Sequence, residues 1–107
     1  MHICGNTTPI LEELGKLGCE IVDLDHMVPM TEARAKMGPG QVLLGNIDPV
    51  SVLLNGTREA VTEGIAACHQ ACAPRYIVGA GCEVPRGTPR ENVLALAAYA
   101  RTASLTR

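Results

Sequence analysis

Short apolar runs alternate along the chain with segments whose apolar residues recur every three or four positions. The short runs are continuously apolar, which is typical of parallel strands that are buried on both faces. Ile10, Leu11, Leu14 and Leu17 show the helical spacing of the first intervening segment. The pattern predicts strands at 2–4, 20–25, 41–45 and 76–80, and helices at 10–17, 31–37, 57–72 and from 88 onward.

Residues that favour helix ends lie at the borders of these segments. Gly18 ends the first helix, and Thr57 is placed to cap the third. Asp48 and Pro49 predict one short turn of helix after the third strand. The last helix opens with a capping box, 88–91, that has proline at its first position.

Strands that alternate with helices predict an α/β fold with a parallel sheet and right-handed crossovers. A chain of 107 residues, 1–107, is expected to form a single domain. Four consecutive βα units fit either a small open sheet of the flavodoxin kind or half of an eight-stranded barrel, which takes about 250 residues. The pattern alone leaves both open, but the reactive groups at the strand ends favour the barrel.

The composition excludes several classes of partner. Aromatic residues make up 2% of the chain, so the core is expected to be aliphatic, and the net charge of −2 offers no basic surface for nucleic acid or anionic lipid. No apolar run approaches the roughly 18 residues needed to span a bilayer, and the first residues lack the features of a signal peptide. We therefore expect a cytoplasmic protein with no nucleic-acid or membrane partner.

Polar side chains follow each predicted strand at its carboxyl end, where parallel α/β folds collect their reactive groups. His2 and Cys4 are two positions apart, so both project from one face of a strand. An imidazole beside a thiolate is a half-site for zinc, and a third ligand such as Cys82 would complete a catalytic three-ligand set. Spacing alone also permits these cysteines to be core residues. The strand-end groups are His2, Cys4, Asp23, Asp25, Asn46, Asp48, Cys82 and Glu83.

The other cysteines are expected to be core residues. Cys68 and Cys72 share the apolar face of the third helix, and Cys19 begins a buried strand. His69 is expected to point outward. His26 follows the second strand, where it is either a proton-handling neighbour of the site or a partly solvated loop residue.

The residues so assembled resemble the uroporphyrinogen decarboxylase superfamily. The segment 2–7 is similar to the zinc-binding segment of its cobamide-dependent branch, the methylcobamide:coenzyme M methyltransferases. The segments 22–25, 44–49 and 87–93 are similar to successive segments of the wider superfamily, in the same order. The Gly-His-Gly of the decarboxylases is replaced by 79–82, which ends in Cys82, and this favours the methyltransferase branch.

The resemblance implies a zinc site, a reaction and a fold. His2, Cys4 and Cys82 would be the zinc ligands, and Asp25 would be a fourth ligand, a hydrogen-bond acceptor that orients His2, or only a cap for the next loop. The implied reaction is methyl transfer from a methylcorrinoid, carried by a partner corrinoid protein, to a small thiol such as coenzyme M. The implied fold is a (β/α)8 barrel, of which this sequence carries the last four units.

Because His2 directly follows Met1, the first four strands of such a barrel are expected to be absent. Two unpaired sheet edges would then remain, so we expect a homo-oligomer, association with a missing N-terminal half barrel, or origin from a split or truncated gene. Two other functions stay open. One is a decarboxylase-like protein without metal, and the other is a non-catalytic α/β module that completes another chain's barrel.

Overall fold

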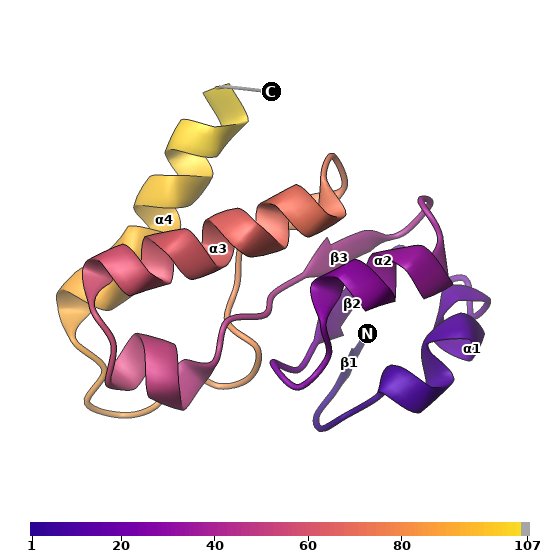
Figure 1. Ribbon diagram of the computed structural model, residues 1–107, viewed down its shortest axis with the longest axis horizontal. Helices are drawn as coiled ribbons and strands as arrows, with labels where there is room; N and C mark the ends of the chain where they lie inside the picture. Colours follow the sequence, from indigo (N-terminus) through magenta and orange to yellow (C-terminus); the bar gives the residue numbers. More distant parts are fainter. Residues whose placement is uncertain (106–107) are drawn as a thin grey trace.

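The computed structural model describes residues 1–105 as parallel strands that alternate with helices (Figure 1). The strands form one sheet in the order β1-β2-β3-β4, with each neighbouring pair parallel. The predicted α/β class and its four βα units are therefore confirmed. The strands are β1 (His2–Ile3), β2 (Ile21–Leu24), β3 (Val42–Leu44) and β4 (Tyr76–Ile77); the helices are a 3-10 turn (Thr8–Ile10), α1 (Leu11–Gly15), α2 (Met30–Met37), a π-helical segment (Pro49–Leu54), α3 (Arg58–Cys72) and α4 (Arg90–Leu105).

The order of the strands separates the two architectures that the sequence left open. A flavodoxin-like sheet places its first strand between the second and the third. Here each strand pairs with its successor in the chain, as in a (β/α)8 barrel. The structure therefore has the strand order of consecutive units of a barrel.

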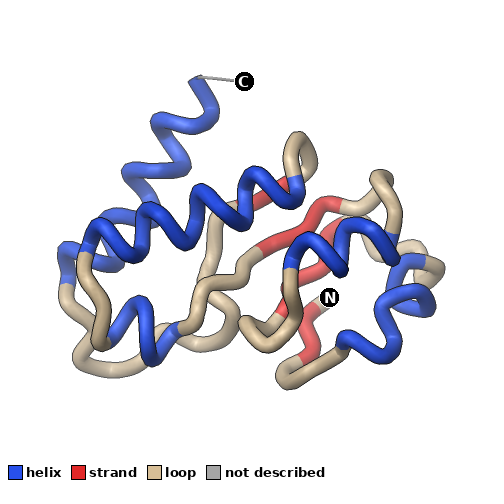
Figure 2. The backbone as a smooth tube through the Cα atoms, viewed as in Figure 1, coloured by secondary structure: helices blue, strands red, loops and turns tan. Residues whose placement is uncertain are grey.

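The two faces of the sheet differ in what covers them. Val22, Leu24 and Leu43 point to one face, where they are buried in a cluster with residues of α1, α2 and α3. Figure 2 shows the helices lying in front of the strands. Ile21 and Ile77 lie on the opposite face and remain 43% and 41% exposed. Because side chains alternate along a strand, His2 and Asp23, which are partners in the β1–β2 register, also lie on this open face.

Two apolar clusters hold the helices against the sheet. The first packs α1 and α2 on β2 and β3, and the second joins the π-helical segment, α3 and α4. Cys68 and Tyr76 contact both clusters and so link them. The core is aliphatic, as the composition predicted; its fully buried members include Leu11, Val22, Leu24, Val28, Leu43, Leu53, Val61 and Ile65.

Several elements are shorter or longer than the sequence predicted. The first helix ends at Gly15, and Leu17, which was expected on its apolar face, is 60% exposed in the turn that follows. The fourth strand ends at Ile77, and only an isolated bridge between Ile47 and Ala80 continues its pairing. The turn after Asp48 becomes a six-residue π-helical segment. None of the helices described within residues 1–105 is long and apolar enough to cross a membrane.

The buried face of α4 is built around an asparagine. Asn92 is 1% exposed, and its Nδ2 donates to the carbonyl oxygens of Leu53 (2.8 Å) and Gly56 (3.0 Å). Val93, the next residue, is 39% exposed. The inward face of α4 therefore includes Asn92, whose side-chain amide satisfies two backbone carbonyls, and leaves Val93 partly open to solvent.

Candidate metal centre

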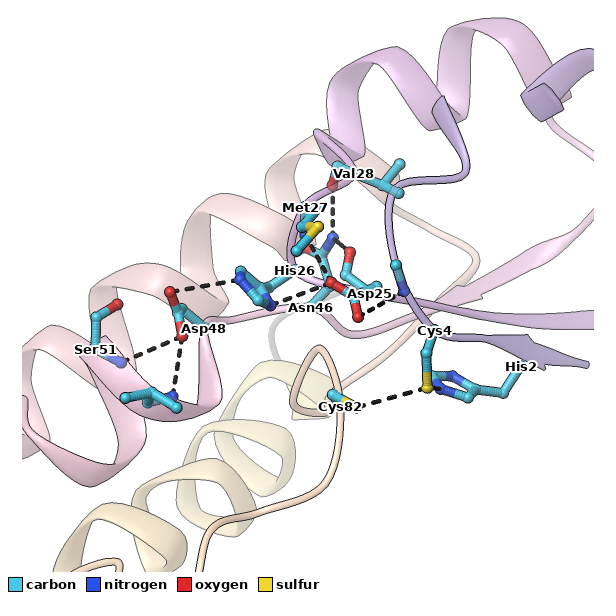
Figure 3. A network of polar contacts seen from close by, with 12 residues as sticks. His2, Cys4, Asp25, His26, Met27, Val28, Asn46, Asp48, Ser51 and Cys82 are labelled. Atoms are coloured by element: carbon cyan, nitrogen blue, oxygen red, sulfur yellow. Dashed lines mark hydrogen bonds and ion pairs between the residues drawn. The ribbon is translucent and has the colours of Figure 1, made fainter. Parts of the chain in front are cut away.

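His2, Cys4 and Cys82 bring their side chains together at the carboxyl edge of the sheet (Figure 3). Side chains two positions apart along a strand project from the same face, which explains why His2 in β1 and Cys4 directly after it point the same way. Cys82 lies in the loop that joins β4 to α4. One nitrogen or sulfur atom from each residue lies within 4.8 Å of the other two. The sequence suggested these three residues, and the fold places them within reach of one ion.

The meeting of Cys4 and Cys82 depends on tertiary structure, because β1 and β4 are the two edge strands. Three strand spacings in a flat sheet would separate them by about 14 Å. The loop after β4 returns across the carboxyl edge, where the amide of Gly81 donates to the carbonyl oxygen of Ile47 at 2.8 Å. A Cβ atom at Gly81 would lie 2.4 Å from the backbone nitrogen of His26, so only glycine permits this approach.

The distances within the cluster fit a tetrahedral zinc site. Two thiolates on one tetrahedral zinc lie about 3.7–3.8 Å apart, given Zn–S bonds of about 2.3 Å. The Sγ atoms of Cys4 and Cys82 are 3.7 Å apart. Nε2 of His2 is 3.1 Å from Sγ of Cys4, whereas zinc-bound nitrogen and sulfur atoms are separated by about 3.6 Å. A small shift of the imidazole would therefore complete the set.

Asp23 orients the imidazole of His2. Oδ2 of Asp23 is 3.1 Å from Nδ1 of His2, so Nε2 is left to face Cys4. Ligand histidines in proteins commonly use their second ring nitrogen in this way, which fixes the ring and raises its basicity. The sequence suggested this role for Asp25, and the structure gives it to Asp23, because the β1–β2 register pairs Asp23 directly with His2.

Asp25 instead holds the turn that follows Cys4. Its Oδ2 accepts from the backbone N–H of Gly5 and its Oδ1 accepts from that of Met27, both at 3.0 Å. Oδ1 also lies 3.1 Å from Nδ1 of His26. Asp25 is 5% exposed, and among the described residues it does not belong to the group of His2, Cys4 and Cys82. The cap considered in the sequence analysis is thus present through Met27, with a second contact to Gly5 that the sequence did not reveal.

A second polar network joins the loops after β2 and β3. The imidazole of His26 reaches from Asp25 to Asp48, with Nε2 3.6 Å from Oδ2 of Asp48. Nδ2 of Asn46 donates to the carbonyl oxygens of Asp25 (2.8 Å) and Val28 (2.6 Å). Asp48 also caps the π-helical segment, as predicted, by accepting from the amides of Val50 and Ser51. Asn46 therefore braces the loop that carries Asp25, a role that no local sequence signal indicated.

The charges around the two thiols favour a cation. The pKa of Cys4 is raised by its hydrogen bond with Cys82 and by the charge of that thiol, then by desolvation and by the carboxylates of Asp25 and Glu83. Two thiolates side by side are therefore disfavoured unless a positive charge compensates them. A divalent ion supplies that charge, because coordination deprotonates a thiol. Sulfur and imidazole donors together suit zinc.

The remaining cysteines lie away from this cluster. Cys72 is fully buried, and burial raises the pKa of its thiol to about 11; the charge of Arg34 lowers this pKa to a lesser degree, and Cys68 adds a smaller increase. Cys19 and Cys68 are half-buried and pack against the core, as predicted. The prediction for His69 is wrong: its Nδ1 is 2.8 Å from the hydroxyl of Tyr99, and its ring stacks on Tyr76.

Comparisons with known proteins identify relatives of this chain. The family profile described as uroporphyrinogen decarboxylase (URO-D) matches residues 1–103. A uroporphyrinogen decarboxylase of Anaeromyxobacter dehalogenans is 40% identical over 92 residues, which is 84% of this chain and 26% of that protein. A methylcobamide:CoM methyltransferase of Methanosarcina acetivorans is 33% identical over 93 residues, which is 87% of this chain and 26% of that protein.

A solved structure shows the same arrangement of elements. A methyltransferase from Methanosarcina mazei superposes with a TM-score of 0.83 at 26% identity, over 96% of this chain and 30% of that protein. The chain thus spans about a quarter of the length of the curated relatives named above. Because the family profile covers nearly the whole chain, this protein belongs to the uroporphyrinogen decarboxylase (URO-D) family.

Proposed function

We propose that this chain carries the zinc-binding part of a methyltransferase that moves a methyl group from a methylcorrinoid to a thiol. The observation that supports it most directly is the convergence of His2, Cys4 and Cys82, with a sulfur–sulfur separation of 3.7 Å that suits one zinc ion. A relative named for methylcobamide and CoM supports these donor and acceptor classes. Because the chain spans 26% of that relative, the activity is proposed for an assembly that also contains the rest of a barrel.

In this proposal His2, Cys4 and Cys82 are the zinc ligands. Zinc would hold the substrate thiol as a thiolate near neutral pH, which makes its sulfur nucleophilic. Asp23 keeps Nε2 of His2 directed at the site through its contact with Nδ1. Asp25 fixes the backbone of Gly5 and so the direction of the Cys4 side chain.

The exposure of the cluster suits two substrates of very different size. Cys4 is exposed and Cys82 is half-buried, so the thiol pair is open to the solvent beyond the carboxyl edge of the sheet. A small thiol acceptor of the coenzyme M type would enter there. The methyl donor, a methylcorrinoid held by a partner protein, would approach from the same open side.

Zinc analysis of protein purified without added metal tests the proposal. We expect about one zinc per chain in the wild type and loss of zinc in Cys4→Ser and Cys82→Ser, because each variant removes one of the three ligands. Cys19→Ser is the matched control, since Cys19 is a half-buried thiol outside the cluster. A folded wild-type protein without zinc, or retention of zinc in Cys82→Ser, would refute it.

Decarboxylase-like function without metal is the second candidate. It is favoured by the 40% identity to a uroporphyrinogen decarboxylase over 84% of the chain. In that case Cys4 and Cys82 would have no shared role, and serine at either position would leave metal content unchanged. The same zinc measurement therefore separates the two candidates.

A further inference from the structure

We propose that the metal-free chain has a second, covalent state in which Cys4 and Cys82 form a reversible disulfide. Their Sγ atoms are 3.7 Å apart (Figure 3). A disulfide bond is about 2.05 Å long, so the two sulfurs need to approach by about 1.7 Å. Rotation of the two side chains about their Cα–Cβ bonds is the movement that would bring the sulfurs together.

The backbone on both sides keeps the two thiols together. Gly5, next to Cys4, is held by its hydrogen bond to Asp25. Gly81, next to Cys82, is held by its hydrogen bond to the carbonyl oxygen of Ile47. The fold therefore brings together two residues that are 78 positions apart in the sequence, and it raises the effective concentration of one thiol at the other.

The positions of the other three cysteines make them less accessible to an oxidant than Cys4. Cys72 is fully buried in the core, and Cys19 and Cys68 are half-buried. Sγ of Cys68 contacts Oδ1 of Asn46 at 3.5 Å, which engages it away from the carboxyl-edge cluster. Cys4 is the exposed cysteine of the chain, so it meets an oxidant first.

The oxidant is a low-molecular-weight disulfide, R–S–S–R. The sulfur of Cys4 attacks one sulfur of R–S–S–R, which forms a mixed disulfide and releases one RS⁻. The sulfur of Cys82 then attacks that of Cys4, which forms the Cys4–Cys82 bond and releases the second RS⁻. The protons of the two protein thiols end on the released groups as two R–SH. The protein thiols are oxidised by two electrons, and R–S–S–R is reduced.

Formation of the Cys4–Cys82 disulfide would exclude a bound metal, and a bound metal would exclude the disulfide. Metal coordination requires free thiolates, and the disulfide removes two donors of the cluster at once. This consequence rests on the proposed function, whereas formation of the disulfide rests only on the geometry of Cys4 and Cys82. Metal binding would then be lost under oxidising conditions and restored on reduction of the disulfide.

Tryptic mapping without reduction tests the disulfide. The metal-free chain is incubated with glutathione disulfide, free thiols are alkylated, and the protein is digested. Cleavage after Lys16, Arg75 and Arg86 places Cys4 on 1–16 and Cys82 on 76–86, whereas Cys19 lies on 17–34 and both Cys68 and Cys72 lie on 59–75. We expect these two peptides to be linked, and the free thiols to fall from five to three.

Cysteine variants and added zinc serve as controls for this linkage. Cys4→Ser and Cys82→Ser should give no linked peptides, whereas Cys19→Ser should link as the wild type does. Prior addition of zinc should slow linkage about tenfold or more, because metal-bound sulfurs are withdrawn from exchange. A wild type that stays reduced, stops at a mixed disulfide or links other cysteines overturns the disulfide. Linkage without any zinc binding would refute the metal site alone, and zinc binding without linkage would refute the disulfide alone.

Discussion

At the scale of single residues, the imidazole of His2 lies between a thiol and a carboxylate. Its Nε2 is 3.1 Å from Sγ of Cys4, and its Nδ1 is 3.1 Å from Oδ2 of Asp23. The carboxylate therefore decides which ring nitrogen is offered to a metal. In the proposed zinc site, the affinity for the metal would therefore depend on a residue that does not itself belong to the group of three ligands.

Asp23→Asn is expected to weaken zinc binding by about 10- to 100-fold, because an amide orients the imidazole and raises its basicity less than a carboxylate does. Competition with a chromophoric chelator measures the affinity. The matched control is Glu12→Gln, which removes an exposed carboxylate of the first turn of α1. Equal affinities of wild type and Asp23→Asn would contradict this role of Asp23.

The environment of Asp25 predicts how stability depends on pH. Desolvation is the largest single influence and raises its pKa. The amides of Gly5 and Met27, together with the charges of His26 and His2, outweigh it, and the pKa is lowered. Ionised Asp25 therefore stabilises the fold above the ordinary pKa of about 3.9, and this contribution is lost as the pH falls through the lower folded-state pKa.

Asp25→Asn should lower the free energy of unfolding by about 1–3 kcal/mol at neutral pH, because the backbone amides of Gly5 and Met27 lose a charged acceptor. Urea unfolding at a series of pH values measures this. The gap between wild type and variant should be constant down to about pH 5 and should then narrow with acid. A gap that widens with acid would show that the folded-state pKa is raised.

At the scale of elements, the loop between β4 and α4 decides whether the three candidate ligands His2, Cys4 and Cys82 meet. β4 is an edge strand on the far side of the sheet from β1, and its pairing beyond Ile77 is limited to the bridge between Ile47 and Ala80. The loop can cross the carboxyl edge only where Gly81 passes against the backbone of His26. Cys82 follows directly, so its position depends on that contact.

Gly81→Ala is expected to displace the loop, because the added methyl group would lie 2.4 Å from the backbone nitrogen of His26. We expect weaker zinc binding together with a loss of about 1–3 kcal/mol in unfolding free energy. Zinc titration and urea unfolding report the two effects. Gly40→Ala is the control, since no atom lies within 4 Å of its added Cβ and its φ is not in the left-handed region. Unchanged zinc affinity in Gly81→Ala would show that the loop does not depend on this contact.

At the scale of the whole molecule, one face of the sheet is buried under helices and the other carries exposed apolar side chains. Ile21 and Ile77 are both exposed on this open face, and β1 and β4 each have a neighbour on one side only. Apolar surface and unpaired strand edges both favour association. We expect this face to be covered by a second copy of the chain or by a partner with the remaining units of a barrel.

Ile77→Lys is expected to abolish self-association of the isolated chain, because it places a charge in the apolar part of that face. Light scattering after size-exclusion chromatography gives the molar mass, which should exceed 11.3 kDa for the wild type and return to it for the variant. Leu17→Lys, at an exposed leucine in the turn after α1, should behave as the wild type does. A wild type that is monomeric at every concentration would contradict coverage by a second copy and would leave the partner with the remaining units of a barrel.

The sequence by itself determined the α/β class, the succession of units and the residues of the candidate site, because these depend on local periodicity and on side-chain chemistry. Alternation along one strand already placed His2 beside Cys4. Tertiary structure decided the partners of these residues. The β1–β2 register placed Asp23 beside His2. The loop after β4, which passes His26 at Gly81, brought Cys82 next to Cys4. These contacts join residues up to 78 positions apart in the sequence. Contacts of this kind depend on sheet register and loop path, which the local sequence pattern does not encode.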